Sequence, residues 1–174
     1  MQPGEIMEML AEGERKAIAK STVVAQAVLA NPRIAKILVD ALSSSNPTIV
    51  SHAAHALLTV FKKNPALLKP FASQLMKAFM RDQWEILEQL GKILPGLDLP
   101  KPKQRTLVNR LEQVFYDSPS SIARTSALQA LNDLGAQHRV WRDRSTKAMK
   151  FAFEHGSKAM QARARKLLGV HRKT

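Results

Sequence analysis

One spacing of small and apolar residues recurs along the chain and constrains its fold more than any other feature. Each copy holds a small or apolar residue, a second one four positions later, and an apolar pair seven and eight positions after the first. The copies end at positions 29, 58, 94, 131 and 168, so the last three steps are 36, 37 and 37 residues. Side chains three and four residues apart share one face of an α-helix, and repeats of this length are typical of stacked helix pairs. The copies begin at Ser21, Val50, Ile86, Ala123 and Met160.

Short breaks separate segments of helical length. Between the breaks apolar residues recur three and four positions apart, and no stretch alternates with period two, so the predicted fold is all-α. Pro47 and Pro119 are predicted to lie at helix starts, where a residue without an N–H loses no hydrogen bond. The breaks fall at residues 31–32, 43–47, 64–65, 95–96, 117–119 and 155–156, and at Gly135 and Gly169.

The strongest break is segment 95–102, because three of its eight residues are proline. Proline fixes its own backbone and lacks the N–H that a helix interior needs. We therefore expect a loop here. It would act as a joint inside a single helical-repeat domain spanning residues 1–174, between a near-neutral N-terminal part and a basic C-terminal part.

Two segments resemble the start of the second helix of a HEAT or armadillo repeat. They read NPTIVSHAAHALL over residues 46–58 and DSPSSIARTSA over residues 117–127. In that family an Asp-Pro or Asn-Pro turn precedes a helix that carries Arg just after its first core position, and Arg124 matches that position. The resemblance covers almost the whole chain in pattern, and it identifies an architecture. The other copies depart from it, with Ser51, Leu87 and Gln161 where the family has Arg.

The predicted architecture is a right-handed α-solenoid of about five antiparallel helix pairs, in which each pair covers the apolar face of its neighbour. An irregular helical bundle is the alternative. In either arrangement the repeated apolar positions should form the core. These predicted core residues are Val50, Ala54, Leu57, Leu58, Ile86, Leu90, Ile93, Leu94, Ala127, Leu131, Ala164 and Leu168.

Basic residues are concentrated in the C-terminal part of the chain. The whole sequence has 27 Lys and Arg against 14 Asp and Glu. Residues 1–100 hold 11 basic and 9 acidic residues, whereas residues 101–174 hold 16 and 5. This asymmetry predicts attraction to an acidic surface or to nucleic acid. A terminal repeat also needs a polar outer face, so the alternative is a cap that only keeps the end of the solenoid soluble.

The sequence excludes several kinds of chemistry. The chain has no cysteine, so it cannot form disulfides, thiolate metal sites or a cysteine nucleophile. It has no long apolar stretch and no recognisable secretion signal, which predicts a soluble cytoplasmic protein without a membrane span. Phosphate-binding loops, nucleophile elbows and zinc-protease motifs are absent as well. We therefore expect a protein that is not an enzyme and needs no cofactor.

Two residue groups raise chemical alternatives. His52 and His55 are three positions apart and can share a helical face, but zinc usually needs a third protein ligand that the sequence does not supply. Trp141 and Asp143 are similar in type to the aromatic and acidic residues of HEAT-like DNA glycosylases, the third functional class considered. Successive helical residues point about 100° apart, so these two side chains would not share one face.

We expect a protein partner with an acidic surface, bound by the concave surface and the basic C-terminal end. The resemblance implies that second helices line the concave surface, which would then include His52, His55, Glu88 and Gln129. Nucleic acid is the alternative partner, although this surface does not carry Lys or Arg along its whole length as a phosphate track would. The oligomeric state stays open. The predicted binding cations are Arg139, Arg142, Arg144, Lys147, Lys150, Lys158, Arg163, Arg165 and Lys166.

Overall fold

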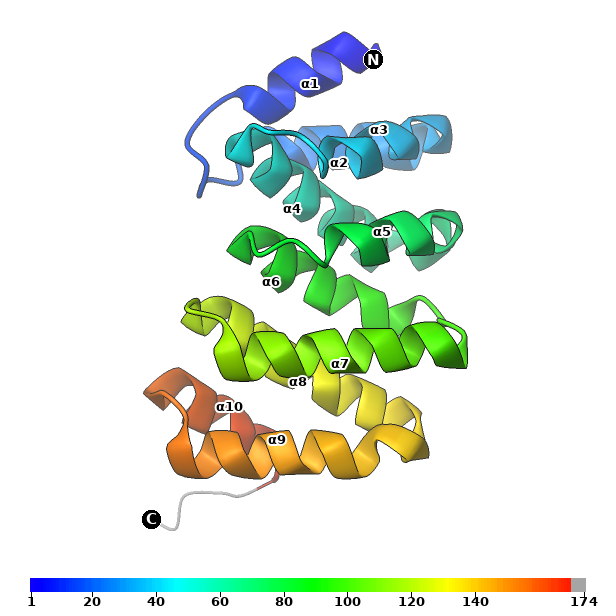
Figure 1. The fold of residues 1–174 in the computed structure, drawn as a ribbon. Coiled ribbons are helices and arrows are strands. Elements are labelled where there is room, and N and C mark those ends of the chain that lie inside the picture. Colours follow the sequence, from blue (N-terminus) through cyan, green and yellow to red (C-terminus); the bar gives the residue numbers. More distant parts are fainter. Residues whose placement is uncertain (170–174) are drawn as a thin grey trace. The chain divides into compact units, whose positions relative to one another are not determined.

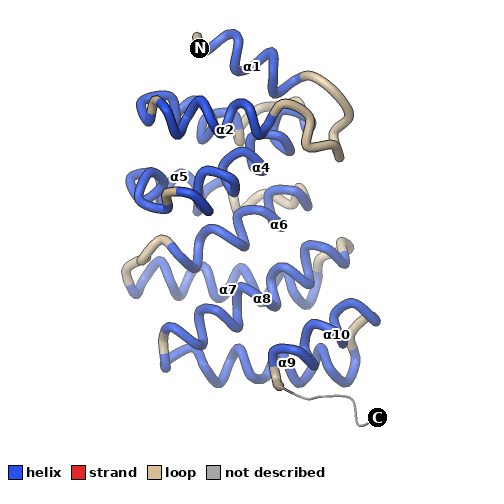
Figure 2. The backbone as a smooth tube through the Cα atoms, turned by 180° about the vertical axis from the view of Figure 1, so that it is seen from behind, coloured by secondary structure: helices blue, strands red, loops and turns tan. Residues whose placement is uncertain are grey.

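The computed structural model describes residues 1–169, and this part of the chain is built from ten α-helices and four short 3-10 helices without a strand. The all-α prediction is therefore confirmed for the described residues (Figure 2). The chain forms two compact units. Unit 1 is Met1–Asp98, and unit 2 begins at Leu99, inside the proline-rich segment 95–102.

Unit 1 is organised around its longest helix, α4 (Pro47–Lys63), which packs against four other helices of the unit (Figure 1). Between residues 51 and 56 α4 buries four small side chains, among them Ala53 and Ala56, so neighbouring backbones can approach closely. The partners of α4 are α1 (Pro3–Ala11), α2 (Ser21–Ala30), α3 (Ala35–Ala41) and α6 (Trp84–Ile93). α4 also packs against η2 (Pro65–Phe71), and the remaining elements of unit 1 are η1 (Pro32–Ile34), α5 (Ala72–Ala78) and η3 (Leu94–Gly96).

The start of α4 confirms the prediction made for Pro47. Asn46 precedes the helix, and its side-chain oxygen accepts a hydrogen bond from the backbone N–H of Thr48 at 2.9 Å. This cap satisfies one of the unpaired N–H groups of the first turn. Pro47 then occupies a first-turn position, where its missing N–H is no loss.

Hydrogen bonds and an ion pair hold the segment between α1 and α2 against α4 and α6. Both ring nitrogens of His52 lie near backbone carbonyl oxygens, 2.8 Å from that of Leu10 and 3.0 Å from that of Glu14. The hydroxyl of Ser51 donates to the carbonyl of Arg15 at 2.8 Å. The Arg15 side chain in turn forms two hydrogen bonds to the carboxylate of Glu85, at 2.5 and 2.8 Å. The segment therefore covers the N-terminal parts of α4 and α6.

Unit 2 is organised around α8 (Ser121–Gln137), which packs against the other helices of the unit. Its start differs from the prediction for Pro119. The Ser120 hydroxyl accepts a hydrogen bond from the N–H of Ala123 at 3.2 Å, so Ser120 is the cap and Pro119 lies in the preceding turn. The partners of α8 are α7 (Lys101–Asp117), η4 (Arg139–Trp141), α9 (Arg142–His155) and α10 (Lys158–Leu167).

Gly135 does not break the chain, contrary to the prediction. It lies inside α8 and is buried where this helix meets α9. A Cβ atom at this position would stand 2.2 Å from Oγ and 2.9 Å from Cβ of Ser145. The glycine therefore permits a close approach of two helices. The loop predicted over residues 95–102 is likewise shorter than expected, because η3 extends to Gly96 and α7 begins at Lys101.

The predicted core residues are buried with one exception. Eleven of the twelve positions belong to the buried class, including Ala127 and Leu131 in unit 2. Leu168 is only partly buried, because it forms the C-cap of α10, the final described helix. The largest fully buried side chains that the repeat spacing did not select are Phe79 in unit 1 and Phe115 in unit 2.

The first prediction concerns the ion pair between Arg15 and Glu85. The Glu85 side chain is 3% exposed and that of Arg15 is 40% exposed. We expect Arg15→Ala to lower the free energy of unfolding by about 1–3 kcal/mol, because it leaves a buried carboxylate without its partner. Denaturant unfolding measures this loss.

Lys36→Ala provides the matched control for the Arg15 substitution. It breaks the Lys36–Asp40 pair, whose side chains are 66% and 59% exposed, so the loss should stay below about 0.5 kcal/mol. Adding Glu85→Gln to Arg15→Ala should restore part of the stability, since a neutral amide costs less to bury. Equal losses for the two alanine variants would contradict the structural role of Arg15.

The second prediction concerns the contact at Gly135. Alanine is favoured over glycine inside helices by about 1 kcal/mol, yet Gly135→Ala should destabilise the protein by about 1–3 kcal/mol because its Cβ would overlap Ser145. Gly4→Ala is the control, since Gly4 lies in α1 with nothing within 4 Å of the added Cβ. Thermal unfolding of both variants checks the contrast. A Gly135→Ala protein as stable as the wild type would show that the helices do not approach this closely.

Candidate functional site

The structure gives the nine predicted binding cations different roles. Arg144 faces α7, where its Nε donates to Glu112 at 2.8 Å and its Nη2 donates to Asn109 at 2.8 Å. The hydrogen bond to Glu112 raises the pKa of Arg144 above its usual range. Arg144 therefore joins α9 to α7, and its charge is compensated within unit 2.

Two cations of α10 also contact neighbouring side chains. Arg163 donates to the side-chain oxygen of Gln129 at 2.8 Å, and Gln129 donates to Asp133 at 2.8 Å. The guanidinium carbon of Arg165 lies 6.0 Å from the centre of the Phe153 ring, a cation–π distance. The structure thus brings together Gln129 and Arg163, which the sequence assigned to the concave surface and the basic end respectively.

Most of the predicted cations are nevertheless exposed to solvent. Arg144 and Arg165 are partly buried, whereas the other seven lie on the surface of η4, α9 and α10. Along α10, Lys158 and Lys166 occupy the face opposite the buried Met160 and Ala164. These seven residues, which we call the exposed cations, are Arg139, Arg142, Lys147, Lys150, Lys158, Arg163 and Lys166.

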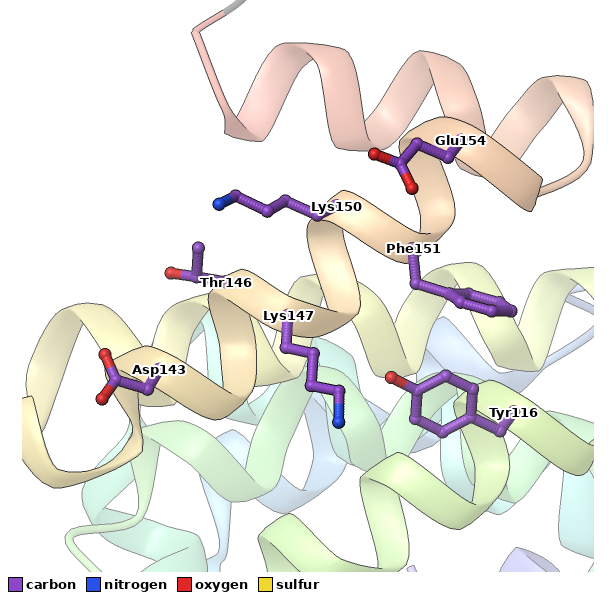
Figure 3. A pocket seen from close by; sticks show the side chains of 7 residues that line it. All are labelled: Tyr116, Asp143, Thr146, Lys147, Lys150, Phe151 and Glu154. Carbon is purple, nitrogen blue, oxygen red and sulfur yellow. The ribbon is translucent and has the colours of Figure 1, made fainter.

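Lys147 and Lys150 border a hollow of about 470 Å³ on the outer side of α9, which we call the α7–α9 hollow (Figure 3). The two lysines leave α9 in different directions, and Phe151 and Tyr116 lie at the α7 side of the hollow. Its complete lining is Tyr116, Asp143, Thr146, Lys147, Lys150, Phe151 and Glu154. Carboxylates therefore flank the two lysines along this face of α9.

The aromatic rings at the hollow contact one another edge to face. The Tyr116 and Phe151 rings meet edge to face with their centres 5.2 Å apart. Both also contact the buried Phe115, at 4.7 and 6.1 Å. Burial, followed by the nearby carboxylate of Glu112, raises the pKa of Tyr116 above its usual value. Tyr116 and Phe151 are each more than a third exposed and together present a rigid apolar edge.

The sequence reasoning missed Phe151 and Tyr116 as surface residues. Phe151 follows Lys147 by four positions, so the helical period itself places it beside the predicted cations. Tyr116 lies on α7, and its place next to α9 depends on how the helices pack. No pattern in the sequence indicated that contact.

In unit 1 the two histidines predicted for the concave surface lie in different environments. His52 is fully buried against the carbonyls of Leu10 and Glu14, so the expectation that it lies on a partner-binding surface is wrong. His55 is partly buried, and its Nδ1 lies 3.0 Å from the hydroxyl of Ser21. The Ser21 hydroxyl is 2.6 Å from the carbonyl of Ile18, to which it donates, so it accepts from the His55 ring.

Glu88 lies close enough to His55 to influence its charge. On α6, Lys92 donates to Glu88 at 2.7 Å, and both residues act electrostatically on the His55 ring of α4. The structure therefore brings together two of the predicted concave residues, His55 and Glu88. The net environment still disfavours a charged imidazole, because burial and then Lys62 lower the pKa of His55.

The residue groups considered for catalysis do not assemble. Trp141 is buried, and its ring N–H donates to the side-chain oxygen of Gln104 at 3.0 Å, whereas Asp143 is exposed. Within residues 1–169 no three His, Asp or Glu side chains gather as a metal site would require. No helix of this described part is both long and apolar enough to cross a membrane.

The sequence matches no protein-family model, and no curated protein matches it. The function is therefore inferred from the residues, contacts and charges described above.

The third prediction concerns the pH dependence contributed by His55. Its pKa in the folded protein lies below the usual value of 6.5, whereas the unfolded chain has the usual value. As the pH falls below 6.5, the unfolded state binds a proton before the folded state does, so acidification lowers the free energy of unfolding. This loss is complete once the pH has passed the lower, folded pKa.

We expect wild-type stability to fall more than that of His55→Gln as the pH is lowered from 7 through this window. Titration of the ring resonances by NMR should give a midpoint for His55 below 6.5. A midpoint above that value, or parallel stability curves for the two proteins, would contradict the burial assigned to this ring.

Proposed function

We propose that the chain is a non-catalytic helical-repeat protein that binds an acidic partner protein through unit 2. Its architecture in this proposal is a right-handed solenoid of about five antiparallel, HEAT-like helix pairs. The repeated apolar spacing supports this architecture, as does its burial in both units. A scaffold of this kind would hold the partner on its concave surface and at its basic C-terminal end.

The set of exposed cations carries the proposal. Residues 99–169 contain 14 basic and 5 acidic side chains, whereas unit 1 contains 11 and 9. Seven of the nine predicted binding cations face solvent, and of these Arg163 also donates a hydrogen bond to Gln129. Clustered charge of one sign steers an oppositely charged partner and selects against basic ones.

Two carboxylates favour a protein partner over nucleic acid. Asp143 and Glu154 lie on either side of Lys147 and Lys150 along the outer face of α9. A phosphate backbone gains most of its affinity from a continuous cationic track, and these carboxylates interrupt such a track. A protein surface can instead place its acidic and basic groups to match two cations that lie between two carboxylates.

Charge reversal tests the proposal, with poly-L-glutamate as the probe. We expect the triple substitution Arg142→Glu, Lys158→Glu and Lys166→Glu to weaken binding by at least about tenfold at low salt, because it lowers the net charge of residues 99–169 from +9 to +3. Fluorescence anisotropy measures the affinity. Circular dichroism should show unchanged helicity, since all three side chains are exposed.

The control lowers the net charge of unit 1 by the same amount, with three Lys→Glu substitutions. Lys16→Glu, Lys63→Glu and Lys77→Glu alter exposed residues and should weaken binding by less than about threefold. Equal weakening by both triple variants would show that net charge alone governs binding and that unit 2 has no binding surface. Tighter binding of an oligothymidylate of matched charge, with a steep loss on adding salt, would favour nucleic acid instead.

A further inference from the structure

We propose that the α7–α9 hollow receives an aromatic side chain from an acidic segment of the partner protein. This inference rests on the proposed function and names the contact that would give it specificity. The exposed cations attract acidic segments in general. The hollow adds a place where one side chain of that segment is recognised by shape and ring contact.

The rings at the hollow are suited to an aromatic guest. Tyr116 and Phe151 are 37% and 36% exposed, and Phe115 beneath them is fully buried, so their edges are held in place before any partner arrives. Preformed aromatic edges lose little conformational entropy on binding. A third ring can join the edge-to-face arrangement that Tyr116 and Phe151 already make.

The charges around the rings favour acidic flanks on the guest. Lys147 and Lys150 leave α9 in different directions at the hollow (Figure 3). Carboxylates on either side of an aromatic residue can therefore meet one ammonium group each. Glu154 and Asp143 occupy the same face and would repel a chain that carries a charge at every unit. The combination selects a peptide whose acidic residues surround an uncharged aromatic one.

The test compares two fluorescently labelled peptides on the full-length protein. One has a central Trp flanked by Glu residues, and the other has Ala in place of Trp. We expect the wild type to bind the Trp peptide about three- to tenfold more tightly, the range expected for one aromatic contact. The ratio of the two affinities isolates the hollow, because both peptides have the same charge.

Phe151→Ala and Tyr116→Ala should each abolish this preference while leaving the affinity for the Ala peptide nearly unchanged. Phe153→Ala is the matched control, since Phe153 lies on the same helix, is 37% exposed and contacts Arg165 outside the hollow. It should keep the wild-type ratio. Circular dichroism of each variant establishes that it is folded, and Tyr116→Ala removes a ring at the surface of α7.

The outcomes separate this inference from the proposed function. If both peptides bind equally to the wild type, or if Phe153→Ala removes the preference as fully as Phe151→Ala, the hollow is not the aromatic site, although unit 2 can still bind acidic partners. If neither peptide binds, the proposed function fails with it. If oligothymidylate binds more tightly than both peptides and depends on Phe151 and Tyr116, the rings stack on bases and the peptide assignment is overturned.

Discussion

The close approach of α8 and α9 at Gly135 is the constraint on which the proposed surface of unit 2 depends. The added Cβ of any other residue would overlap Ser145, so only glycine permits this separation. The depth at which α9 sits decides whether Arg144 reaches Glu112 and whether Phe151 meets Tyr116. A single buried contact thus positions both the ion pair that anchors α9 and the hollow on its outer side.

Hydrogen bonds and ring contacts within unit 2 determine which of its cations remain available to a partner protein. Arg144 donates to Glu112, and Arg165 makes a cation–π contact with Phe153, so neither side chain is fully available to bind a partner. Lys158 and Lys166 lie on the face of α10 opposite its buried residues and face solvent. A count of basic residues in the sequence therefore overstates the binding charge. Unit 2 is still the more basic of the two units, because most of its predicted binding cations are exposed.

Much of the fold could be predicted from periodicity, whereas close contacts could not. The repeated spacing selects buried positions such as Leu57 and Leu131, because a helical period alone decides which face is apolar. Gly135 was misread as a break, since a glycine that ends a helix and one that permits close packing look alike in sequence. His52 was placed on a surface because nothing local indicates that the carbonyls of Leu10 and Glu14 cover it. Both errors concern contacts between different helices or segments, which helical periodicity does not reveal.

The most direct test of the central claim is a residue-by-residue map of where an acidic ligand binds. Amide NMR spectra of the full-length protein, recorded while the Glu-flanked Trp peptide is added, provide that map. The account predicts shifts concentrated on α9, α10 and the end of α7 around Tyr116, with unit 1 largely unchanged. Shifts centred on α4 and α6 near His55, or spread evenly over both units, would contradict it.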